Sequence, residues 1–277
     1  MKTLDTCKII RPLAQAIEHA LTNVEKETDA KLRYAAKNES SPLAAWALNR
    51  LVENNEIAAK TCSFACQDTG LAVIFAEIGQ SLCLTGMLFE DAVNEGVRQG
   101  YKSARKSVAD PLTRLNTRDN TPAIIHTRIT EGDTLTLHYL AKGAGSENMS
   151  KLYMLTPSKG REGIIAAAAD CVKSAGANPC PPVILGIGIG GTAEKAVLLS
   201  KHALLRTCGQ PSDDPECAAL EADILSAVNA LGIGAQGLGG STTALSVAVE
   251  TFPTHIGMLP VAINMQCHSV RHATLKF

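Results

Sequence analysis

The sequence lacks the features that mark several special classes of protein. Its formal net charge is −1, from 26 Lys and Arg against 27 Asp and Glu, which argues against a basic surface for nucleic acid or for a membrane. No apolar run is long enough to span a bilayer. The start of the chain carries Asp5 and lacks the apolar core of a secretory signal. We therefore expect a soluble, cytoplasmic protein with no nucleic-acid or membrane partner.

Close cysteine pairs are also scarce. The nine cysteines are an odd number without a small disulfide-rich framework, so we expect reduced thiols. Four of them lie in apolar or helical contexts and are predicted to be small buried residues: Cys7, Cys83, Cys171 and Cys208. Structural zinc sites usually draw ligands from pairs such as C-x2-C. Here Cys62-x3-Cys66 is the one near pair, and no convincing second pair accompanies it.

Three other cysteines stand in unusual polar or proline-rich settings. The stretches are Cys66-Gln67-Asp68-Thr69-Gly70, Asn178-Pro179-Cys180-Pro181-Pro182, and Asn264-Met265-Gln266-Cys267-His268-Ser269. A buried core segment would not carry so many polar groups, because each one needs a hydrogen-bond partner. The three thiols are 114 residues (180 − 66) and 87 residues (267 − 180) apart. Thiolates that converge from separate turns suit an iron–sulfur cluster, although spacing alone leaves this a hypothesis.

Helical and strand-like patterns alternate along the chain. Helices are predicted within 5–53 (one of them from Pro42 to Leu51) and over 89–107, 159–175 and 193–205; strands over 71–75, 183–185 and 254–263; and a β-hairpin around Glu131-Gly132-Asp133. We therefore predict a mixed α/β, helix-rich fold with a helical N-terminal part and short sheets that carry the cysteine loops. No sharp boundary is visible, so residues 1–277 are expected to form a single domain.

Three passages are rich in glycine. Lys142–Asn148 can present several backbone N–H groups to an anion, and no role is assigned to 232–240. The third, Gly186-x-Gly188-x-x-Gly191, formally matches the dinucleotide fingerprint between a strand and a helix. The next segment, 207–215, reads as a loop and not as a second strand ending in an acid. A nucleotide-binding module that uses the Gly186–Thr192 turn is therefore the alternative from a different class; otherwise these glycines serve close approach to a ligand or tight packing of a helix.

Four motifs in order carry a resemblance to a known family: Cys66-Gln-Asp-Thr-Gly, Lys142-Gly-Ala-Gly-Ser-Glu-Asn, Cys180-Pro-Pro with the glycines up to Thr192, and Asn264-Met-Gln-Cys-His. Together they resemble class I fumarate hydratase, in particular the alpha subunit of its two-subunit form, over nearly the whole sequence. The resemblance implies a 4Fe-4S cluster on Cys66, Cys180 and Cys267, and reversible hydration of fumarate to (S)-malate, a step of the tricarboxylic acid cycle. Tartrate dehydratase alpha subunits share two of the motifs and are the nearest alternative. The Gly-Ser-Glu-Asn ending favours fumarase.

The resemblance also implies roles for other residues. Asp68 would protonate or deprotonate the substrate hydroxyl. Substrate contacts are implied for Gln67, Arg105, Ala144, Gly145 and His255. Ala144 departs from the glycine triplet that is common in the family. The base for the carbon-bound proton lies, in the family, outside the part that this chain resembles, so the chain is expected to act with a beta subunit, as two alpha and two beta chains.

Overall fold

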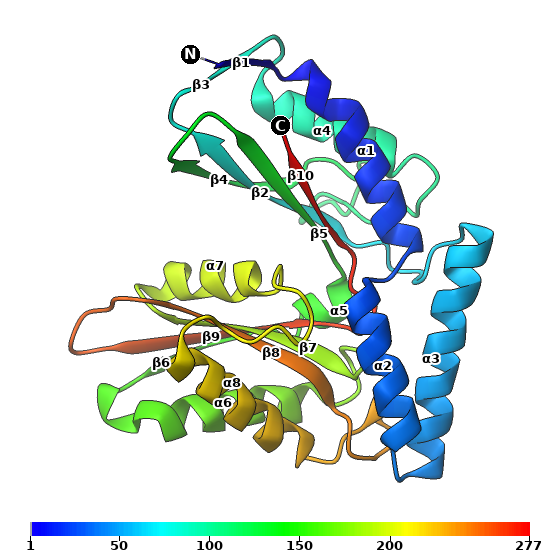
Figure 1. Ribbon diagram of the computed structural model, residues 1–277, viewed down its shortest axis with the longest axis vertical. Coiled ribbons are helices and arrows are strands. Elements are labelled where there is room, and N and C mark those ends of the chain that lie inside the picture. The colour runs from blue at the N-terminus through cyan, green and yellow to red at the C-terminus, as the bar shows by residue number, and fades with distance from the viewer. Residues whose placement is uncertain (1) are drawn as a thin grey trace. The chain divides into compact units, whose positions relative to one another are not determined.

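The computed structural model describes residues 2–277, which divide into two compact units (Figure 1). Unit 1 contains residues 2–25, 57–144 and 271–277, and unit 2 contains residues 26–56 and 145–270. The chain crosses between the units after Glu25, Glu56, Ala144 and Val270. Because the units are interleaved in this way, no single stretch of sequence could mark a boundary. The prediction that residues 1–277 form one domain is not decided by this division and stays a prediction.

Unit 1 is built on a four-stranded sheet with the strand order β10-β5-β2-β4. Its elements are β1 (Lys2–Asp5), α1 (Cys7–Thr22), β2 (Leu71–Gly79), β3 (Leu82–Thr85), α4 (Phe89–Gly100), β4 (Ile124–Thr130), β5 (Leu135–Lys142) and β10 (His272–Lys276), with β1 and β3 in a separate parallel pair. Ile9, Leu13 and Ile17 recur at helical spacing on α1 and are fully buried against α4 and the sheet. The helical stripe predicted for the N-terminal part is confirmed.

The strands β4 and β5 do not pair with each other, so the predicted hairpin is wrong. Both of them flank β2: Val73 pairs with Ile124 in parallel, and Ile74 pairs with Tyr139 in antiparallel register. The turn at Gly132 passes around the end of β2, where a Cβ on Gly79 would lie 2.6 Å from the Gly132 carbonyl oxygen. The alternating pattern marked two strands correctly but did not specify their partners, because β2 is buried and needs a neighbour on each side.

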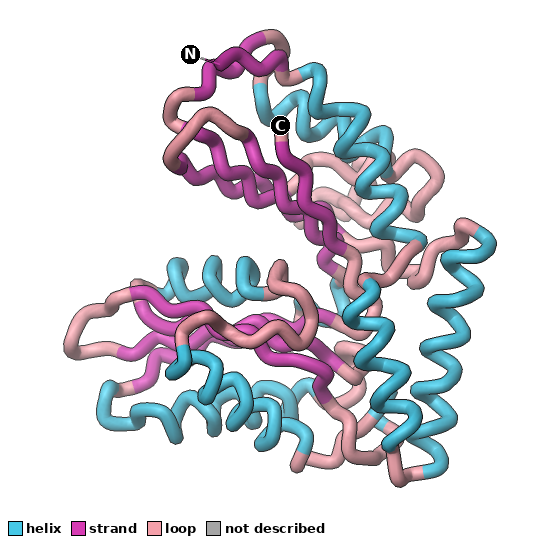
Figure 2. Tube along the Cα trace, in the orientation of Figure 1, coloured by secondary structure: helices cyan, strands magenta, loops and turns pink. Residues whose placement is uncertain are grey.

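Unit 2 is built on a second sheet with the order β6-β9-β7-β8 (Figure 2). Its elements are α2 (Lys26–Asn38), α3 (Pro42–Thr61), α5 (Ala144–Glu147), β6 (Lys151–Leu155), the 3-10 turn η1 (Pro157–Lys159), α6 (Gly160–Ala175), β7 (Val183–Gly190), α7 (Ala193–Ala203), α8 (Pro215–Asn229), the 3-10 turn η2 (Ala235–Gly237), β8 (Ala244–Phe252) and β9 (Leu259–Gln266); α3 and α5 continue across the division between the units. Helices α6 and α8 cover one face of the sheet and α7 covers the other (Figure 1). The predicted mixed α/β, helix-rich fold is confirmed.

The glycines between Gly186 and Gly190 lie in strand β7 and not in a turn, which corrects the prediction from sequence. Leu185, Ile187 and Ile189 face the core formed with α6 and α8. Gly186 and Gly188 face α7, where an added Cβ would lie 2.0 Å from the carbonyl oxygens of Ser200 and Ala196 respectively. These glycines therefore let α7 pack tightly on the sheet. Of the two roles that the sequence left open, the structure favours helix packing.

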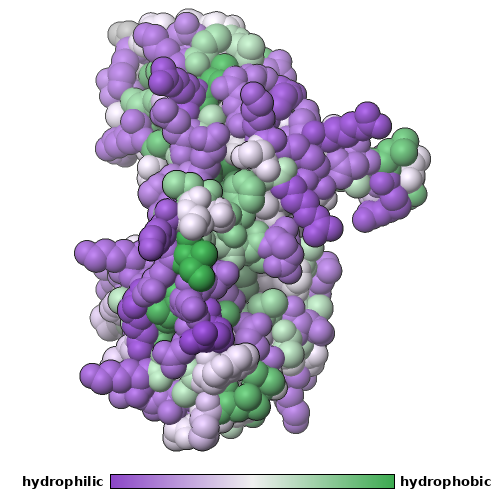
Figure 3. All heavy atoms as spheres, turned by 90° about the vertical axis from the view of Figure 1, so that its right-hand side faces the viewer, coloured by the Kyte–Doolittle hydropathy of each residue, from purple (hydrophilic) through white to green (hydrophobic). Residues whose placement is uncertain are grey.

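The surface is mixed in character. On the face shown in Figure 3, hydrophilic side chains predominate and hydrophobic ones form scattered groups. Exposed apolar residues include Leu43 and Trp46 on α3 and Tyr34 on α2. Among the helices of residues 2–277, none combines the length and the hydrophobicity needed to cross a membrane.

Candidate functional site

The loop from Cys66 to Gly70 connects α3 to β2 in unit 1. Cys66 and Asp68 are half-buried, Gln67 is exposed, and Thr69 is buried. Gly70 has a φ of +77°, and a Cβ at this position would lie 3.0 Å from the backbone nitrogen of Lys142. Only glycine fits such a close approach in the left-handed region. The glycine that ends the motif thus brings the loop next to the end of β5.

The carboxylate of Asp68 is oriented by two backbone N–H groups. Gly70 donates to Oδ1 at 3.0 Å, and Ala144 donates to Oδ2 at 2.7 Å. A Cβ on Gly143 would lie 3.1 Å from Oδ2, so the glycine makes room for this carboxylate. The sequence predicted that the 142–148 passage offers N–H groups to an anion. In unit 1 the anion that receives the N–H of Ala144 is Asp68 itself.

Two buried side chains donate hydrogen bonds to the main chain of the same loop, and a third contacts one of these two. Arg271 is 1% exposed, and its Nη1 donates to the carbonyl oxygen of Asp68. The hydroxyl of Tyr101 donates to the carbonyl oxygen of Thr69 at 3.2 Å and lies 2.7 Å from the hydroxyl of Tyr139. Burial raises the pKa of Tyr101 to about 12, although the hydrogen bond with Tyr139 and the charge of Arg271 lower it in part. The phenol therefore stays a neutral donor.

None of these anchors was predicted. Arg271 follows the Cys267 motif by only a few residues, but an arginine near a chain end is ordinarily read as a surface group. Tyr101 and Tyr139 lie on segments whose helical and strand patterns account for them as core residues. A predicted helix and a predicted strand that each carry one tyrosine give no sign that the two hydroxyls meet.

The main chain of Arg105 contacts the Asp68 loop. Its carbonyl oxygen accepts hydrogen bonds from Thr69 Oγ1 at 2.9 Å and from Asn120 Nδ2 at 2.8 Å. The residue is exposed and lies after the end of α4, which is shorter than predicted and ends at Gly100. Unit 1 thus brings together the positions of Cys66, Gln67, Asp68, Arg105 and Ala144.

In unit 2 the loops of Cys180 and Cys267 lie at the same end of the sheet. Cys180 precedes β7 and Cys267 follows β9, and these strands are antiparallel with Ile184 paired to Gln266. Cys180 is exposed and has a φ of +55°, whereas Cys267 is half-buried. Two of the three predicted ligand thiols are therefore brought to one edge by the register of two strands.

The second half of the 142–148 passage lies at that same edge. A Cβ on Gly145 would lie 3.2 Å from the carbonyl oxygen of Asn178, close to the Cys180 turn. Glu147 accepts a hydrogen bond from Asn264 Nδ2 at 3.1 Å and forms an ion pair with Lys201 of α7. The motif residues Glu147 and Asn264 thus contact each other. Lys201, which holds Glu147, was not singled out from the sequence.

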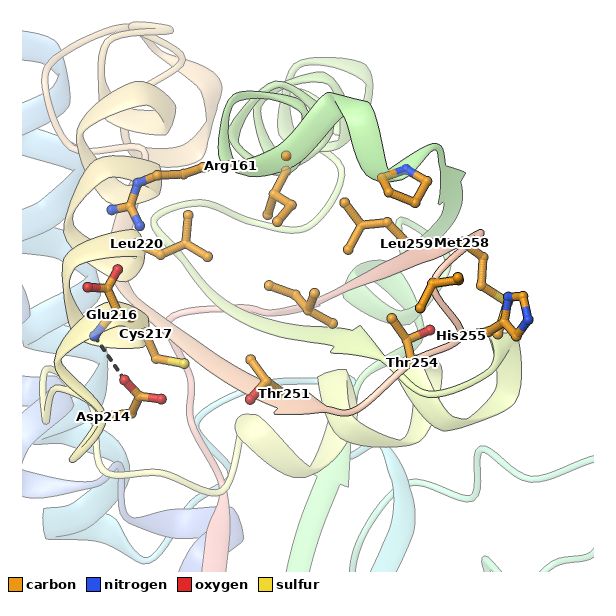
Figure 4. A pocket seen from close by; sticks show the side chains of 15 residues that line it. Arg161, Asp214, Glu216, Cys217, Leu220, Thr251, Thr254, His255, Met258 and Leu259 are labelled. Carbon is orange, nitrogen blue, oxygen red and sulfur yellow. Dashed lines mark hydrogen bonds between the residues drawn. The ribbon is translucent and has the colours of Figure 1, made fainter.

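His255 is not brought next to these loops within unit 2. It lies in the turn between β8 and β9, at the rim of an open pocket of about 570 Å³ that also contains Cys217 and Leu220 (Figure 4). The eight residues of β9 separate this turn from Cys267, which corresponds to roughly 26 Å of extended chain. The Nδ1 atom of His255 accepts a hydrogen bond from Gly257 at 3.1 Å. A contact of His255 with substrate stays a prediction.

The three loop thiols fit iron–sulfur ligation better than the buried cysteines do. No two of the nine form a disulfide within residues 2–277. The buried ones are Cys171, Cys208 and Cys217, and burial raises the pKa of Cys171 to about 12, which disfavours a thiolate. The prediction of burial is wrong for Cys7, which is exposed because the apolar stripe of α1 begins at Ile9, and Cys83 is only half-buried.

Unit 1 supplies one of the three loop thiols and unit 2 supplies the other two. In neither unit, over the described residues, do three His, Cys, Asp or Glu side chains gather into a metal-binding group. Neither unit therefore holds a complete ligand set by itself.

Known proteins resemble nearly the whole chain. The family model described as Fumarate hydratase (Fumerase) matches residues 10–276. The putative L(+)-tartrate dehydratase subunit alpha of Methanocaldococcus jannaschii is 39% identical over 274 residues, which cover 96% of each chain. The L(+)-tartrate dehydratase subunit alpha of Escherichia coli strain K12 is 28% identical over 260 residues, which cover 92% of this chain and 86% of that protein.

Proposed function

The chain belongs to the fumarate hydratase (Fumerase) family, and we propose that it is the alpha subunit of an iron–sulfur hydro-lyase that interconverts fumarate and (S)-malate. The observation that carries this proposal is the fixed carboxylate of Asp68, which lies two residues from the thiol of Cys66 and is oriented by Gly70 and Ala144. A hydro-lyase needs such an oriented acid–base group at the substrate hydroxyl. The proposed setting is the cytoplasm and the tricarboxylic acid cycle.

The proposed cluster ligands are Cys66, Cys180 and Cys267. When it is bound by three thiolates, a 4Fe-4S cluster supplies a Lewis-acidic iron for an oxygen of the substrate. The support from this chain is the donor set: three thiols on exposed or half-buried loops at strand ends. The buried thiols of the core are unsuited to this task.

Asp68 is proposed to move the hydroxyl proton. An ionised carboxylate has about four lone-pair positions, and the N–H groups of Gly70 and Ala144 take one on each oxygen. Positions remain on both oxygens to accept a proton from water during hydration and to return it during dehydration. Arg271 and Tyr101 would keep this carboxylate in place, because they donate hydrogen bonds to the carbonyl oxygens of Asp68 and Thr69 respectively.

The substrate is a dianion, and its proposed contacts come from exposed groups. The guanidinium of Arg105 can bind a carboxylate through two parallel N–H groups, and the exposed amide of Gln67 can donate beside it. Gly145 would offer its N–H at the Cys180 edge of unit 2. The N–H of Ala144 already binds Asp68, so for Ala144 we propose the role of orienting the acid–base group. His255 is retained as a predicted substrate contact.

The remaining catalytic group is proposed to lie in a beta subunit. Elimination of water needs a base at the carbon next to the one that bears the hydroxyl, and Asp68 serves only the hydroxyl. The similar proteins from M. jannaschii and E. coli are both described as alpha subunits, which supports a partner. An assembly of two alpha and two beta chains is proposed. The chain alone, loaded with cluster, should not hydrate fumarate, and activity should rise to a plateau as an equimolar amount of beta subunit is added.

L(+)-tartrate is the second candidate substrate, because the similar proteins named above are described as tartrate dehydratases. (S)-Malate and L(+)-tartrate are both four-carbon dicarboxylates, and tartrate carries one hydroxyl group more. The test is a direct assay of the cluster-loaded complex on fumarate, (S)-malate, L(+)-tartrate and mesaconate, with Asp68→Asn as the inactive control. Turnover of fumarate and (S)-malate supports the first proposal, and exclusive turnover of tartrate replaces it with the second. No turnover of any of them overturns the hydro-lyase proposal.

The nucleotide-binding alternative has lost its main support. The glycines that suggested it are used to pack α7 against β7. Calorimetry with NAD, NADP and ATP should therefore show no specific binding, and a stoichiometric binding isotherm would restore that alternative.

A further inference from the structure

The glycine-rich passage from Gly232 to Gly240 lies outside the motifs of the proposed site. All five of its glycines have a positive φ: Gly232, Gly234, Gly237, Gly239 and Gly240. One residue that is not glycine also has a positive φ: Gln236, with a φ of 54° and a ψ of 19°. Side chains other than glycine, asparagine and aspartate enter this region rarely, and such strain persists only where the surroundings over-determine it.

Gln236 places two donors on a single acceptor. Its backbone N–H donates to the carbonyl oxygen of Pro181 at 2.7 Å, and its side-chain Nε2 donates to the same oxygen at 2.8 Å. A carbonyl oxygen has two lone pairs, so this acceptor is filled by one residue. Pro181 is buried and follows Cys180 directly. This pair of hydrogen bonds, here called the Gln236 clamp, therefore holds the Pro181–Pro182 peptide unit, which begins one residue after a proposed ligand.

Cys180 is held in the same unusual conformation, with a φ of +55°. Its N–H donates to the carbonyl oxygen of Ala177 at 3.0 Å. The glycine passage touches this side of the turn too, since a Cβ on Gly237 would lie 2.5 Å from the Cβ of Ala177. The passage thus contacts the Cys180 turn both before and after the thiol.

The passage is itself closed and anchored. A Cβ on Gly234 would lie 1.6 Å from the carbonyl oxygen of Gly239, so the two ends of the passage approach each other. Beyond it, the carboxylate of Glu39 accepts from the backbone N–H of Ser241 at 2.9 Å and from that of Thr242 at 3.2 Å. The segment that carries Gln236 is therefore itself held in place by close backbone contacts and by the hydrogen bonds to Glu39.

The residue type at position 236 is informative. Glycine would adopt this backbone conformation without strain, and the passage uses glycine at four of the neighbouring positions. Glycine would keep the backbone N–H but would lose the second donor to Pro181. The strain at Gln236 is thus accompanied by one gain, the side-chain hydrogen bond to the carbonyl oxygen of Pro181, the residue after Cys180.

We propose that Gln236 is a positioning residue for Cys180. Its two hydrogen bonds fix the Pro181 carbonyl group and with it the direction in which the Cys180 thiol points. The consequence for the bound cluster rests on the proposed function, which makes Cys180 a ligand. The clamp itself concerns only this chain and can be tested without a cluster.

The test compares Gln236→Gly, Gln236→Ala and the control Leu238→Gly in the full chain. Gln236→Gly relieves the backbone strain and removes the amide, whereas Leu238→Gly adds a glycine to the same passage and leaves the amide in place. In the chain without iron, hydrogen exchange at the Cys180 amide should be roughly fivefold faster in both Gln236 variants, the factor that corresponds to one neutral hydrogen bond. Leu238→Gly should match the wild type.

The second readout uses chains reconstituted anaerobically with iron and sulfide and then mixed with a chelator. Iron should leave the Gln236→Gly chain roughly fivefold faster than the wild type, although the melting temperature of this variant should equal or exceed that of the wild type. A merely structural role would move both quantities in the same direction. Unchanged exchange at Cys180 in both Gln236 variants would overturn the proposal. A wild-type chain that takes up no cluster would instead contradict the proposed function, and the exchange measurement would still judge the clamp.

Discussion

The Asp68 loop of unit 1 and the Cys180 turn of unit 2 both contribute residues to the proposed site but are held by different means. The Asp68 loop is fixed by side chains from distant parts of the sequence, chiefly the buried Arg271 and Tyr101. The Cys180 turn is fixed by a neighbouring loop that approaches closely because it lacks side chains, and by the single amide of Gln236. One loop is held by charged and phenolic donors, and the other is held by backbone shape.

This difference has consequences for both stability and design. A buried guanidinium that donates to a carbonyl oxygen is a strong contact, and its removal leaves a buried acceptor without that partner. A close contact at a glycine depends on the absence of a Cβ atom, so a substitution that adds a Cβ disrupts it. The Asp68 loop should therefore be sensitive to the deletion of particular side chains, and the glycine contacts of unit 2 should be sensitive to the insertion of methyl groups.

The largest effect is expected for an added methyl group in unit 2. In Gly188→Ala the new Cβ would lie 2.0 Å from the carbonyl oxygen of Ala196, so α7 must move away from β7. We expect a loss of about 3 kcal/mol in the free energy of unfolding, measured by urea denaturation. The control is Gly132→Ala in unit 1, where nothing lies within 4 Å and only the positive φ of 93° is unfavourable. It should cost about 1–2 kcal/mol. Equal losses would show that the close approach of α7 to β7 does not depend on the missing Cβ of Gly188.

A smaller effect is expected for deletion of the charged anchor in unit 1. Arg271→Met removes the donor to the Asp68 carbonyl group and should lower the free energy of unfolding by about 1.5–3 kcal/mol. It should also speed hydrogen exchange at Gly70, whose N–H binds the Asp68 carboxylate. Arg271→Lys keeps a charge but not the planar fork, and should recover part of both losses. If Arg271→Met is as stable as the wild type and its Gly70 amide is equally protected from exchange, Arg271 does not anchor the Asp68 loop.

The smallest effect concerns Tyr101 and alkaline pH. Burial raises the pKa of Tyr101 to about 12 in the folded chain, compared with about 10 in the unfolded chain. Between these values the unfolded chain binds fewer protons than the folded one, so stability falls as the pH rises. The contribution of this group is complete below pH 10 and is lost at up to about 1.4 kcal/mol per pH unit above it.

The variant Tyr101→Phe should therefore lose stability less steeply between pH 10 and pH 11 than the wild type, although it should be about 1 kcal/mol less stable at pH 8 because it lacks the hydrogen bond to Thr69. The control is Tyr34→Phe, since Tyr34 on α2 is 70% exposed. It should reproduce the wild-type curve. A parallel shift of the Tyr101→Phe curve, without a change in slope, would argue against titration of this phenol.

The sequence predicted those parts of the fold that depend on local pattern. The helix over 159–175 is observed as α6, and the apolar stripe of Ile9, Leu13 and Ile17 is buried as expected. Strand partners were not predictable, because alternation on β4 and β5 specifies two faces but not which strand lies alongside. The β7 glycines were misread as a turn for a related reason: glycine carries no side chain and so shows no strand pattern.

In the candidate site, the sequence predicted only the residues that belong to recognisable motifs. Cys66, Gln67 and Asp68 are contiguous, so any fold would keep them together. The proximity of Ala144 to Asp68 was unknown until the left-handed Gly70 was seen to bring the loop to β5. Arg271 and Gln236 were missed because each acts on a backbone carbonyl group, and a carbonyl acceptor is present at every residue and leaves no trace in the sequence.

The most direct test of the central proposal is the iron content of cysteine variants. The chain is reconstituted anaerobically as wild type and as Cys66→Ser, Cys180→Ser and Cys267→Ser, with Cys62→Ser as the matched control because Cys62 is exposed and lies four residues before Cys66. We expect about four irons and four sulfides per chain for the wild type and the control, and no stable cluster in the other three variants. Full retention of iron and sulfide in all three would contradict it.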